Sequence, residues 1–237
     1  MTQAGSRVET REVPGLPGPG AGVELSVVVP CLDEGDTLAD CIVKIQGAFR
    51  ENGIAGEVIV ADNGSTDGSH SIASRLGARV VHVKDKGYGN ALRGGLAAAH
   101  GKYVITGDAD NSHDLAQIPA FLGKLQEGYD LVIGNRFKGQ IEVGAMPPLH
   151  RYLGIPVLTG VSKLFFRVPC GDQQCGFRGF SREAFSKMRL RATGMEFASE
   201  RPTFACASPR SPRLNSQPDD VDLPTCSPGG TAGVTCC

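Results

Sequence analysis

The sequence predicts an α/β fold in which a mostly parallel β-sheet is covered by helices on both faces. Short apolar runs alternate with amphipathic patterns between residues 25 and 133, which is the rhythm of parallel strands joined by helices. The chain has 237 residues, of which 41% are hydrophobic and 21% are charged. This length and balance are typical of one large globular α/β domain or two small ones.

The first elements follow from hydrophobic periodicity. Residues 25–29 are apolar and mostly β-branched, which predicts a buried strand that Pro30 ends. Apolar residues between 38 and 49 then recur at helical spacing behind an acidic start. A second buried strand is expected at residues 58–61, and a short helix is expected near residues 67–76.

The same alternation continues to the middle of the chain. Residues 78–83 and 102–106 predict the third and fourth strands. The stretch 88–99 between them is rich in Ala and Leu and predicts a helix. A further helix near residues 115–126 precedes a fifth strand at residues 130–133.

The second half of the chain is less regular. A helix is expected within residues 149–166, and a short strand at residues 177–180. Residues 181–188 predict a short helix with Ser181 as its N-cap. Residues 194–200 have the pattern of the first turn of another helix.

The two ends of the chain differ from the region between them. Residues 1–23 are rich in Gly and Pro and are expected to form a disordered leader. Residues 24–200 form the expected folded domain. Residues 201–237 have scattered Pro, Ser and Cys and no periodicity. Since this change falls inside a helical pattern, it indicates a shifted reading frame. We therefore expect the domain to be truncated at its C-terminal end and to be followed by an irregular tail.

Composition excludes several classes of protein. The formal net charge of -1 gives no argument for a nucleic-acid partner. No apolar run reaches the roughly 18 residues of a membrane span, and the N-terminus lacks the pattern of a signal peptide. Cys170 and Cys175 have no second Cys or His pair at zinc-site spacing. We therefore expect a cytoplasmic protein without a structural zinc site.

Two carboxylates one residue apart, Asp108 and Asp110, directly follow the fourth expected strand. The carboxyl ends of the strands are where open α/β sheets bind ligands. Two neighbouring carboxylates repel each other unless a cation lies between them, and oxygen ligands favour Mg²⁺ or Mn²⁺. The pattern predicts a metal site, and the alternative is a capped loop with a solvated pair of aspartates.

Four motifs occur in one order along the chain. They are Pro-Cys-Leu-Asp-Glu at residues 30–34, Asp-Asn-Gly-Ser-Thr-Asp-Gly at 62–68, Asp-Ala-Asp at 108–110 and Gly-Phe-Arg at 176–178. Over about residues 25–200 the chain therefore resembles glycosyltransferase family 2, and within it the dolichyl-phosphate (polyprenyl-phosphate) mannose and glucose synthases. The resemblance implies a GT-A fold, a nucleotide-sugar donor such as GDP-mannose or UDP-glucose, Mg²⁺ or Mn²⁺, and an inverting transfer.

The resemblance also implies the residues of the donor site. Asp110 is the implied principal metal ligand, with Asp108 on the ribose or on the waters of the metal. On the residues alone, Glu34 can equally be part of an acidic helix start. The implied donor-binding residues are Pro30, Glu34, Asp62, Asp108, Ala109, Asp110 and Arg136.

The acceptor side is implied to involve Asp172, Arg178 and Glu196. A phosphate monoester has a second pKa of about 6, so it can attack with little help from a base. This favours a phosphate acceptor. The resemblance implies that it is a polyprenyl phosphate and that the chain works at the inner face of the cell membrane without spanning it. His113, beside the aspartate pair, is interpreted as polar loop surface.

Two alternatives remain open. A saccharide or small-molecule hydroxyl as acceptor would need Asp172 or Glu196 as a general base. The alternative from another class is a truncated, non-catalytic nucleotide-binding fragment.

Overall fold

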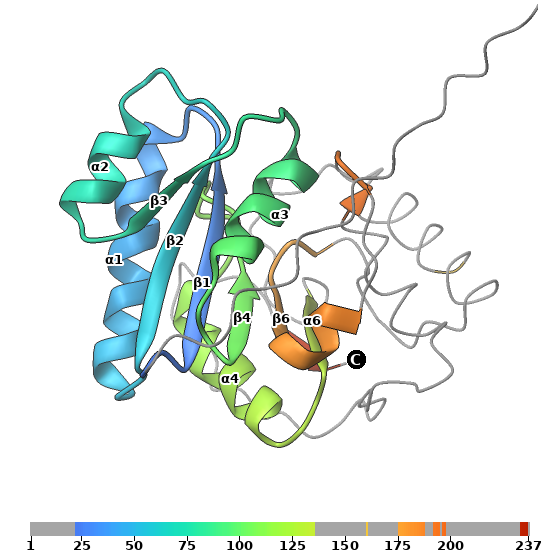
Figure 1. The fold of residues 1–237 in the computed structure, drawn as a ribbon. Helices are drawn as coiled ribbons and strands as arrows, with labels where there is room; N and C mark the ends of the chain where they lie inside the picture. Colours follow the sequence, from blue (N-terminus) through green and yellow to red (C-terminus); the bar gives the residue numbers. More distant parts are fainter. Residues whose placement is uncertain are drawn as a thin grey trace, which may run out of the picture.

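The structure, a computed structural model, describes residues 22–135, 175–187 and 192–194, together with residues 160, 196–197 and 233–236 (Figure 1). The expected helix within residues 149–166 lies outside the described residues, apart from residue 160, which is helical. Most of the expected leader and tail also lie outside the described residues.

A seven-stranded mixed sheet forms the centre of the described region, in the order β3-β2-β1-β4-β6-β5-β7. Strands β1 to β4 pair in parallel, and β6 pairs antiparallel with both β4 and β5. Because β6 is antiparallel to both β4 and β5, strand β5 runs in the same direction as β4 and β1. The expected mostly parallel sheet is therefore confirmed. The strands are β1 (Leu25–Cys31), β2 (Gly56–Asp62), β3 (Arg79–His82), β4 (Tyr103–Thr106), β5 (Leu131–Asn135), β6 (Arg178–Ser181) and β7 (Gly233–Cys236).

Helices cover both faces of the sheet, as expected (Figure 1). On one face α1 contacts both α2 and α4, while α3 packs over β1 and β2 on the other. Among the described residues, no helix is both long and apolar enough to cross a membrane. The helices are α1 (Gly35–Glu51), α2 (Ser69–Arg75), α3 (Tyr88–Ala98), α4 (Ile118–Gln126), which follows the 3₁₀ turn η1 (Leu115–Gln117), and α6 (Arg182–Lys187).

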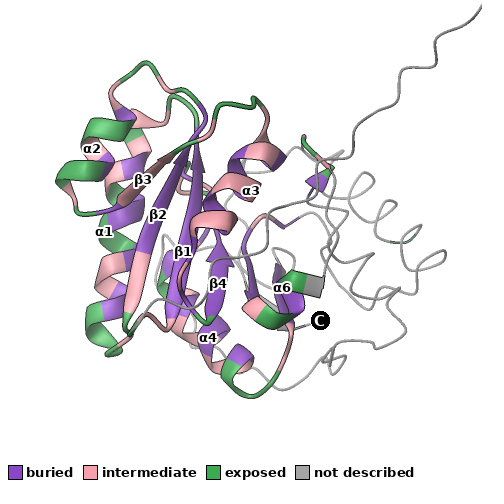
Figure 2. Cartoon of the chain, viewed as in Figure 1, coloured by how far each residue is buried: buried purple, intermediate pink, exposed green. Residues whose placement is uncertain are grey.

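The core lies between the sheet and these helices (Figure 2). Every residue of β1 is buried, because both faces of this central strand are covered. On the α3 face, Gly95 lies so close to β1 that a Cβ there would be 2.5 Å from Val28 Cγ1. The high glycine content of α3 therefore allows the helix to approach the sheet closely.

The first strand is longer than the sequence predicts. We expected Pro30 to end it, but β1 pairs with β2 as far as Cys31. Val28 O accepts a hydrogen bond from Gly107 N, which follows β4. Because alternate residues of a strand face the same neighbour, the backbone nitrogen of Pro30 also faces the β4 side. The β4 ladder ends at Val28, so the missing N–H of Pro30 leaves no ladder bond unmade.

The C-terminal elements include one that the sequence did not predict. The expected cap of α6 is confirmed, because Ser181 Oγ accepts a hydrogen bond from Ala184 N at 3.1 Å. We expected no element after residue 200, yet β7 pairs antiparallel with β5. Strand β7 therefore lies along the edge of β5.

A polar network joins β1, β2 and β3 to the end of α3. The Glu57 carboxylate accepts hydrogen bonds from Ser26 Oγ at 2.6 Å, Arg79 Nη2 at 2.7 Å and the backbone N–H of His100 at 2.8 Å. Burial opposes the ionisation of Glu57, but these hydrogen bonds outweigh it and lower its pKa.

We predict that Glu57 makes the stability of the chain depend on pH. A carboxyl group whose pKa is lowered by folding stabilises the protein above its unfolded value of about 4.3, and this contribution is lost as pH falls through the folded pKa. Glu57→Gln should lower the free energy of unfolding by ~1–2 kcal/mol at pH 7. The difference from the unaltered chain should shrink towards pH 3, as measured by thermal unfolding.

The exposed Glu51 at the end of α1 provides a matched control. Glu51→Gln should change the stability little at any pH. If Glu57→Gln lowers the free energy of unfolding by the same amount at pH 7 and at pH 3, the role of the ionised carboxylate is contradicted.

Candidate functional site

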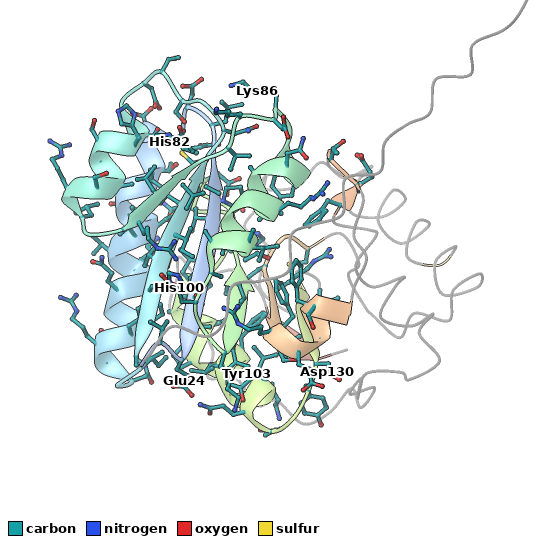
Figure 3. The ribbon with its side chains drawn as sticks, in the orientation of Figure 1. Glu24, His82, Lys86, His100, Tyr103 and Asp130 are labelled. Atoms are coloured by element: carbon teal, nitrogen blue, oxygen red, sulfur yellow. The ribbon has the colours of Figure 1, made fainter. Side chains whose placement is uncertain are left out.

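A cleft of about 570 Å³ opens at the carboxyl ends of β1, β2 and β4. In Figure 3, Lys86 lies at this end of the sheet, and Glu24 and Tyr103 lie at the opposite end. The loops after these strands line the cleft together with the start of α3 and the residues before β6. The lining residues are Pro30, Cys31, Leu32, Glu34, Asn63, Lys86, Gly87, Tyr88, Ala91, Asp108, Ala109, Asp110, Ser112, His113 and Gly176.

Asp108 lies in the cleft with both carboxylate oxygens hydrogen-bonded. Tyr88 Oη donates to Asp108 Oδ1 at 2.8 Å, and His113 Nε2 lies 2.9 Å from Asp108 Oδ2. The side chain of Asp108 is 28% exposed and that of His113 is 5% exposed. The carboxylate is therefore held from two sides, by the first residue of α3 and by the loop after β4.

The surroundings of Asp108 favour its ionised form. Burial opposes ionisation most strongly, but the hydrogen bond and charge of His113, the Tyr88 hydroxyl and the charge of Arg178 together lower the pKa of Asp108. Gly176 completes the enclosure, because a Cβ at this position would lie 2.5 Å from Asp108 Oδ2. Asp108 is thus a carboxylate at neutral pH.

Two further carboxyl groups line the same cleft, Glu34 and Asp110. Burial, followed by the charge of Asp110 and then that of Asp108, raises the pKa of Glu34. Three acidic groups that repel one another are the environment in which a divalent cation is stabilised. These oxygen donors therefore fit Mg²⁺ or Mn²⁺ chemically.

The described residues do not by themselves form a complete metal cage. Among them, no three His, Cys, Asp or Glu side chains are grouped so that they could hold an ion. An ion bound by Asp108 and Asp110 would need further ligands, and Mg²⁺ is often held by one or two carboxylates plus the phosphates of a substrate.

The loop that carries the two aspartates is fastened to α1. Cys41 Sγ lies 3.4 Å from both Ala109 O and Asn111 Oδ1, which share its single S–H donor, and Lys44 Nζ donates to Asn111 Oδ1 at 3.0 Å. Asn111 has a φ of 60°, a left-handed conformation that Asn tolerates better than most residues. The side chain and the backbone of Asn111 thus both fix the course of this loop.

In the loop after β2, Asn63 is part of the cleft lining and Asp62 is not, although both residues are buried. Asp62 is 3% exposed, and its carboxylate accepts from Ser65 N at 3.0 Å and lies 3.1 Å from His82 Nδ1. Burial opposes ionisation of Asp62, but the Ser65 and His82 hydrogen bonds lower its pKa. Asp62 therefore orders the turn, while its neighbour Asn63 lines the cleft.

The structure brings five of the predicted site residues together in the cleft. They are Pro30, Glu34, Asp108, Ala109 and Asp110. The other predicted residues are placed elsewhere or are not described.

Three predicted residues are described outside the lining of the cleft. Besides Asp62, these include Arg178, which is 1% exposed and donates to Cys175 O at 2.6 Å. Glu196 is exposed, and it accepts from Gly194 N at 3.1 Å. Arg136 and Asp172 lie outside the described residues.

Sequence reasoning missed three side chains of the cleft. Tyr88 and Lys86 belong to the Gly-rich stretch 86–91, which resembles the family's entry to its third helix, but the sequence favours a tight turn there and assigns no role to either side chain. His113 is not polar surface as expected: it is 6% exposed and stacks on Phe177 with ring centroids 5.6 Å apart. A pattern of residue types along the chain contains no signal for that burial, which depends on Phe177 from a distant segment.

Comparison with known proteins agrees with this geometry. Residues 26–189 match the sequence model of the family described as Glycosyl transferase family 2. The chain is 41% identical over 177 residues to the low-salt glycan biosynthesis hexosyltransferase Agl6 of Haloferax volcanii, covering 74% of this chain and 43% of that protein. It is 33% identical over 186 residues to the glycosyltransferase AglJ of the same organism, covering 78% and 58%. The chain therefore spans about half the length of these curated relatives.

A solved structure has a similar fold. Glucosyl-3-phosphoglycerate synthase of Mycobacterium tuberculosis, in complex with Mn²⁺, uridine diphosphate and phosphoglyceric acid, superposes with a TM-score of 0.59 at 27% identity. The superposition covers 76% of this chain and 62% of that one. The fold is thus of the GT-A type that the motifs imply.

We predict that the backbone of Asn111 limits what can replace it. Asn111→Ala should lower the free energy of unfolding by ~1–2 kcal/mol, because alanine is strained at positive φ. Asn111→Gly removes the same hydrogen bonds from Lys44 and Cys41 but relieves the strain, so it should be more stable than Asn111→Ala. Urea unfolding of the two variants compares them directly, and equal stabilities would show that the loop does not require this conformation.

Proposed function

The chain belongs to glycosyltransferase family 2, and on that premise we propose that it transfers a hexose from a nucleoside-diphosphate sugar to a polyprenyl phosphate. The proposed transfer inverts the anomeric configuration and depends on a divalent cation. The observation that supports it most directly is the cleft at the carboxyl edge of the sheet, which Asp108, Asp110 and Glu34 all line. The donor would be a GDP or UDP sugar, such as GDP-mannose or UDP-glucose.

In this proposal the two aspartates hold Mg²⁺ or Mn²⁺ together with the donor diphosphate. Asp110 is the principal ligand because it is the more exposed carboxylate, and Asp108 contacts the ribose or the waters of the metal. Bound there, the ion would offset the negative charge that develops on the departing nucleoside diphosphate.

The nucleoside would lie towards the ends of β1 and β2. Pro30 and Asn63 line that part of the cleft, and the buried carboxylate of Asp62 keeps the turn in shape. Lys86 is the one Lys or Arg among the described residues that line the cleft, and its Nζ donates to Asn63 O. Its positive charge would lie close to the negatively charged donor.

The arrangement of His113 favours a phosphate acceptor. His113 uses Nε2 for Asp108, and its Nδ1 is buried without a hydrogen-bond partner in the described structure. It is therefore not arranged to take a proton from an acceptor hydroxyl in the cleft. A phosphate acceptor needs no such step, since it is already an anion near neutral pH.

The remaining acceptor residues stay predictions. Asp172 is proposed to position the acceptor, and Glu196 is proposed to lie on the same side, while Arg136 stays a predicted donor-binding residue. The positive charge of the buried Arg178 acts on Asp108. Because a polyprenyl phosphate presents its phosphate at the bilayer surface, we propose that the reaction takes place at the cytoplasmic face of the membrane.

A small phosphorylated acid is the second candidate acceptor. It is favoured by the structural similarity to a synthase that was solved with phosphoglyceric acid and UDP-glucose. The proposed donor site is the same for both candidates. They differ only in the acceptor molecule, which is a small phosphorylated acid here and a polyprenyl phosphate in the first proposal.

The donor site is tested by thermal unfolding of the chain with GDP, UDP and their sugar conjugates, with and without Mn²⁺. A ligand of the native state at ~100 times its Kd should stabilise it by ~2.7 kcal/mol. We expect stabilisation by one nucleotide that requires Mn²⁺ and is lost in Asp110→Asn. Asp40→Asn, a change on the exposed face of α1, is the matched control and should respond like the unaltered chain.

The acceptor is tested with a sugar nucleotide that carries a radiolabel in the sugar. We expect the label to enter the organic phase with a polyprenyl phosphate and to stay in water with 3-phosphoglycerate. Transfer to 3-phosphoglycerate alone would support the second candidate. Nucleotide binding without transfer to either would contradict both candidates and support a saccharide acceptor or the non-catalytic alternative.

A further inference from the structure

We propose that Tyr88 and His113 are positioning residues that hold the Asp108 carboxylate in the orientation required by the metal and the nucleotide. The proposal rests on the proposed function, because it concerns the same donor site. It deepens that function by assigning to two side chains of the cleft lining roles that act through Asp108. Four features of the structure support it.

The first feature is that the two donors come from opposite sides of the carboxylate. Tyr88 is the first residue of α3 and donates to Oδ1, and His113 lies in the loop after β4 and is bonded to Oδ2. A carboxylate bonded at one oxygen can still turn about its Cβ–Cγ bond. Bonded at both oxygens by donors on separate elements, Asp108 has a single orientation.

The second feature is the environment of the His113 ring. It is stacked on Phe177 with an angle of 20° between the rings, and Phe177 in turn contacts Phe121, with centroids 4.3 Å apart. Because Asp108 is a carboxylate and accepts hydrogen bonds, Nε2 must bear the proton of this pair. The buried Nδ1 has no hydrogen-bond partner in the described structure, and burying it unpaired costs free energy. The bond from Nε2 to Asp108 explains why the ring is nevertheless held in this position.

The third feature is the anchoring of Tyr88. Asn90 N donates to Thr193 O at 3.1 Å, which ties the first turn of α3 to the segment 192–194. Gly87 and Gly89 allow this contact, since a Cβ at either would lie within 3.0 Å of Thr193 backbone atoms. The backbone on both sides of Tyr88 is therefore fixed, and the direction of its hydroxyl is set by the fold.

The fourth feature is the packing of Gly176 against the carboxylate. The position of its absent Cβ lies 2.5 Å from Asp108 Oδ2 and 3.3 Å from Oδ1. The backbone of this segment thus closes the space into which Asp108 could otherwise turn. Asp108 is held by two hydrogen bonds and by contact with the main chain.

A positioning role predicts a specific loss of metal-dependent binding. Outer-shell partners of metal ligands typically change metal affinity by about 10–100-fold when they are replaced. We therefore expect Tyr88→Phe and His113→Phe each to weaken nucleotide binding in the presence of Mn²⁺ by about tenfold or more. His113→Phe keeps an aromatic ring against Phe177 and removes the donor, and binding without metal should be unaffected.

The first experiment is calorimetric titration of the whole chain with GDP and UDP, with and without Mn²⁺. In the second, electron paramagnetic resonance measures the binding of Mn²⁺ alone. His113→Gln restores a donor at a position similar to Nε2 and should recover most of the affinity lost in His113→Phe. Tyr129→Phe removes a hydroxyl after α4, away from the cleft lining, and is the matched control. In turnover, raising Mn²⁺ should restore the rate of Tyr88→Phe, which a general loss of folding would not allow.

The outcomes separate the two proposals. If the unaltered chain binds the Mn²⁺–nucleotide pair and both Phe variants bind it equally well, the positioning role is wrong and the proposed function stands. If the variants lose metal-free binding to the same extent, they have damaged the cleft as a whole, and the positioning role is likewise wrong. If the unaltered chain binds no nucleotide under any condition, the proposed function fails, and the positioning role fails with it.

Discussion

The arrangement of the site depends on keeping one carboxylate, that of Asp108, ionised in a partly buried position. Burial alone would raise its pKa and favour the neutral acid. The His113 and Tyr88 hydrogen bonds and the charge of Arg178 reverse this effect. These residues come from the loop after β4, from α3 and from β6, so the need to stabilise one charge joins three parts of the fold.

The parallel sheet makes this convergence possible. Its neighbouring strands β1, β2 and β4 end at the same edge, so the residues that follow them meet although they are far apart in the sequence. The reversed strand β6 begins at that edge, and the residues before it place Gly176 against Asp108 and Phe177 against His113. The cleft is thus bounded on one side by parallel strand ends and on the other by an antiparallel strand start.

The motifs identified the acidic members of the site, because charged residues directly after apolar strands are visible in the sequence. They did not identify how each carboxylate is used. Asp62 and Asn63 are adjacent and both are buried, yet Asp62 bonds Ser65 and His82, while Asn63 lines the cleft and bonds residues 83–87. Likewise, Arg178 follows a recognisable Gly-Phe pair, but its burial depends on strand pairing across the sheet.

The sequence by itself determined the order of strands and helices, the alternation that favours a parallel sheet, and the acidic pair at the end of β4. These follow from local periodicity and from turn residues, which act over a few positions. Only the tertiary structure decided that His113 is buried against Phe177, that Tyr88 reaches Asp108 and that β7 pairs with β5. These contacts join residues distant in sequence, and their energies depend on packing and desolvation that no local pattern encodes.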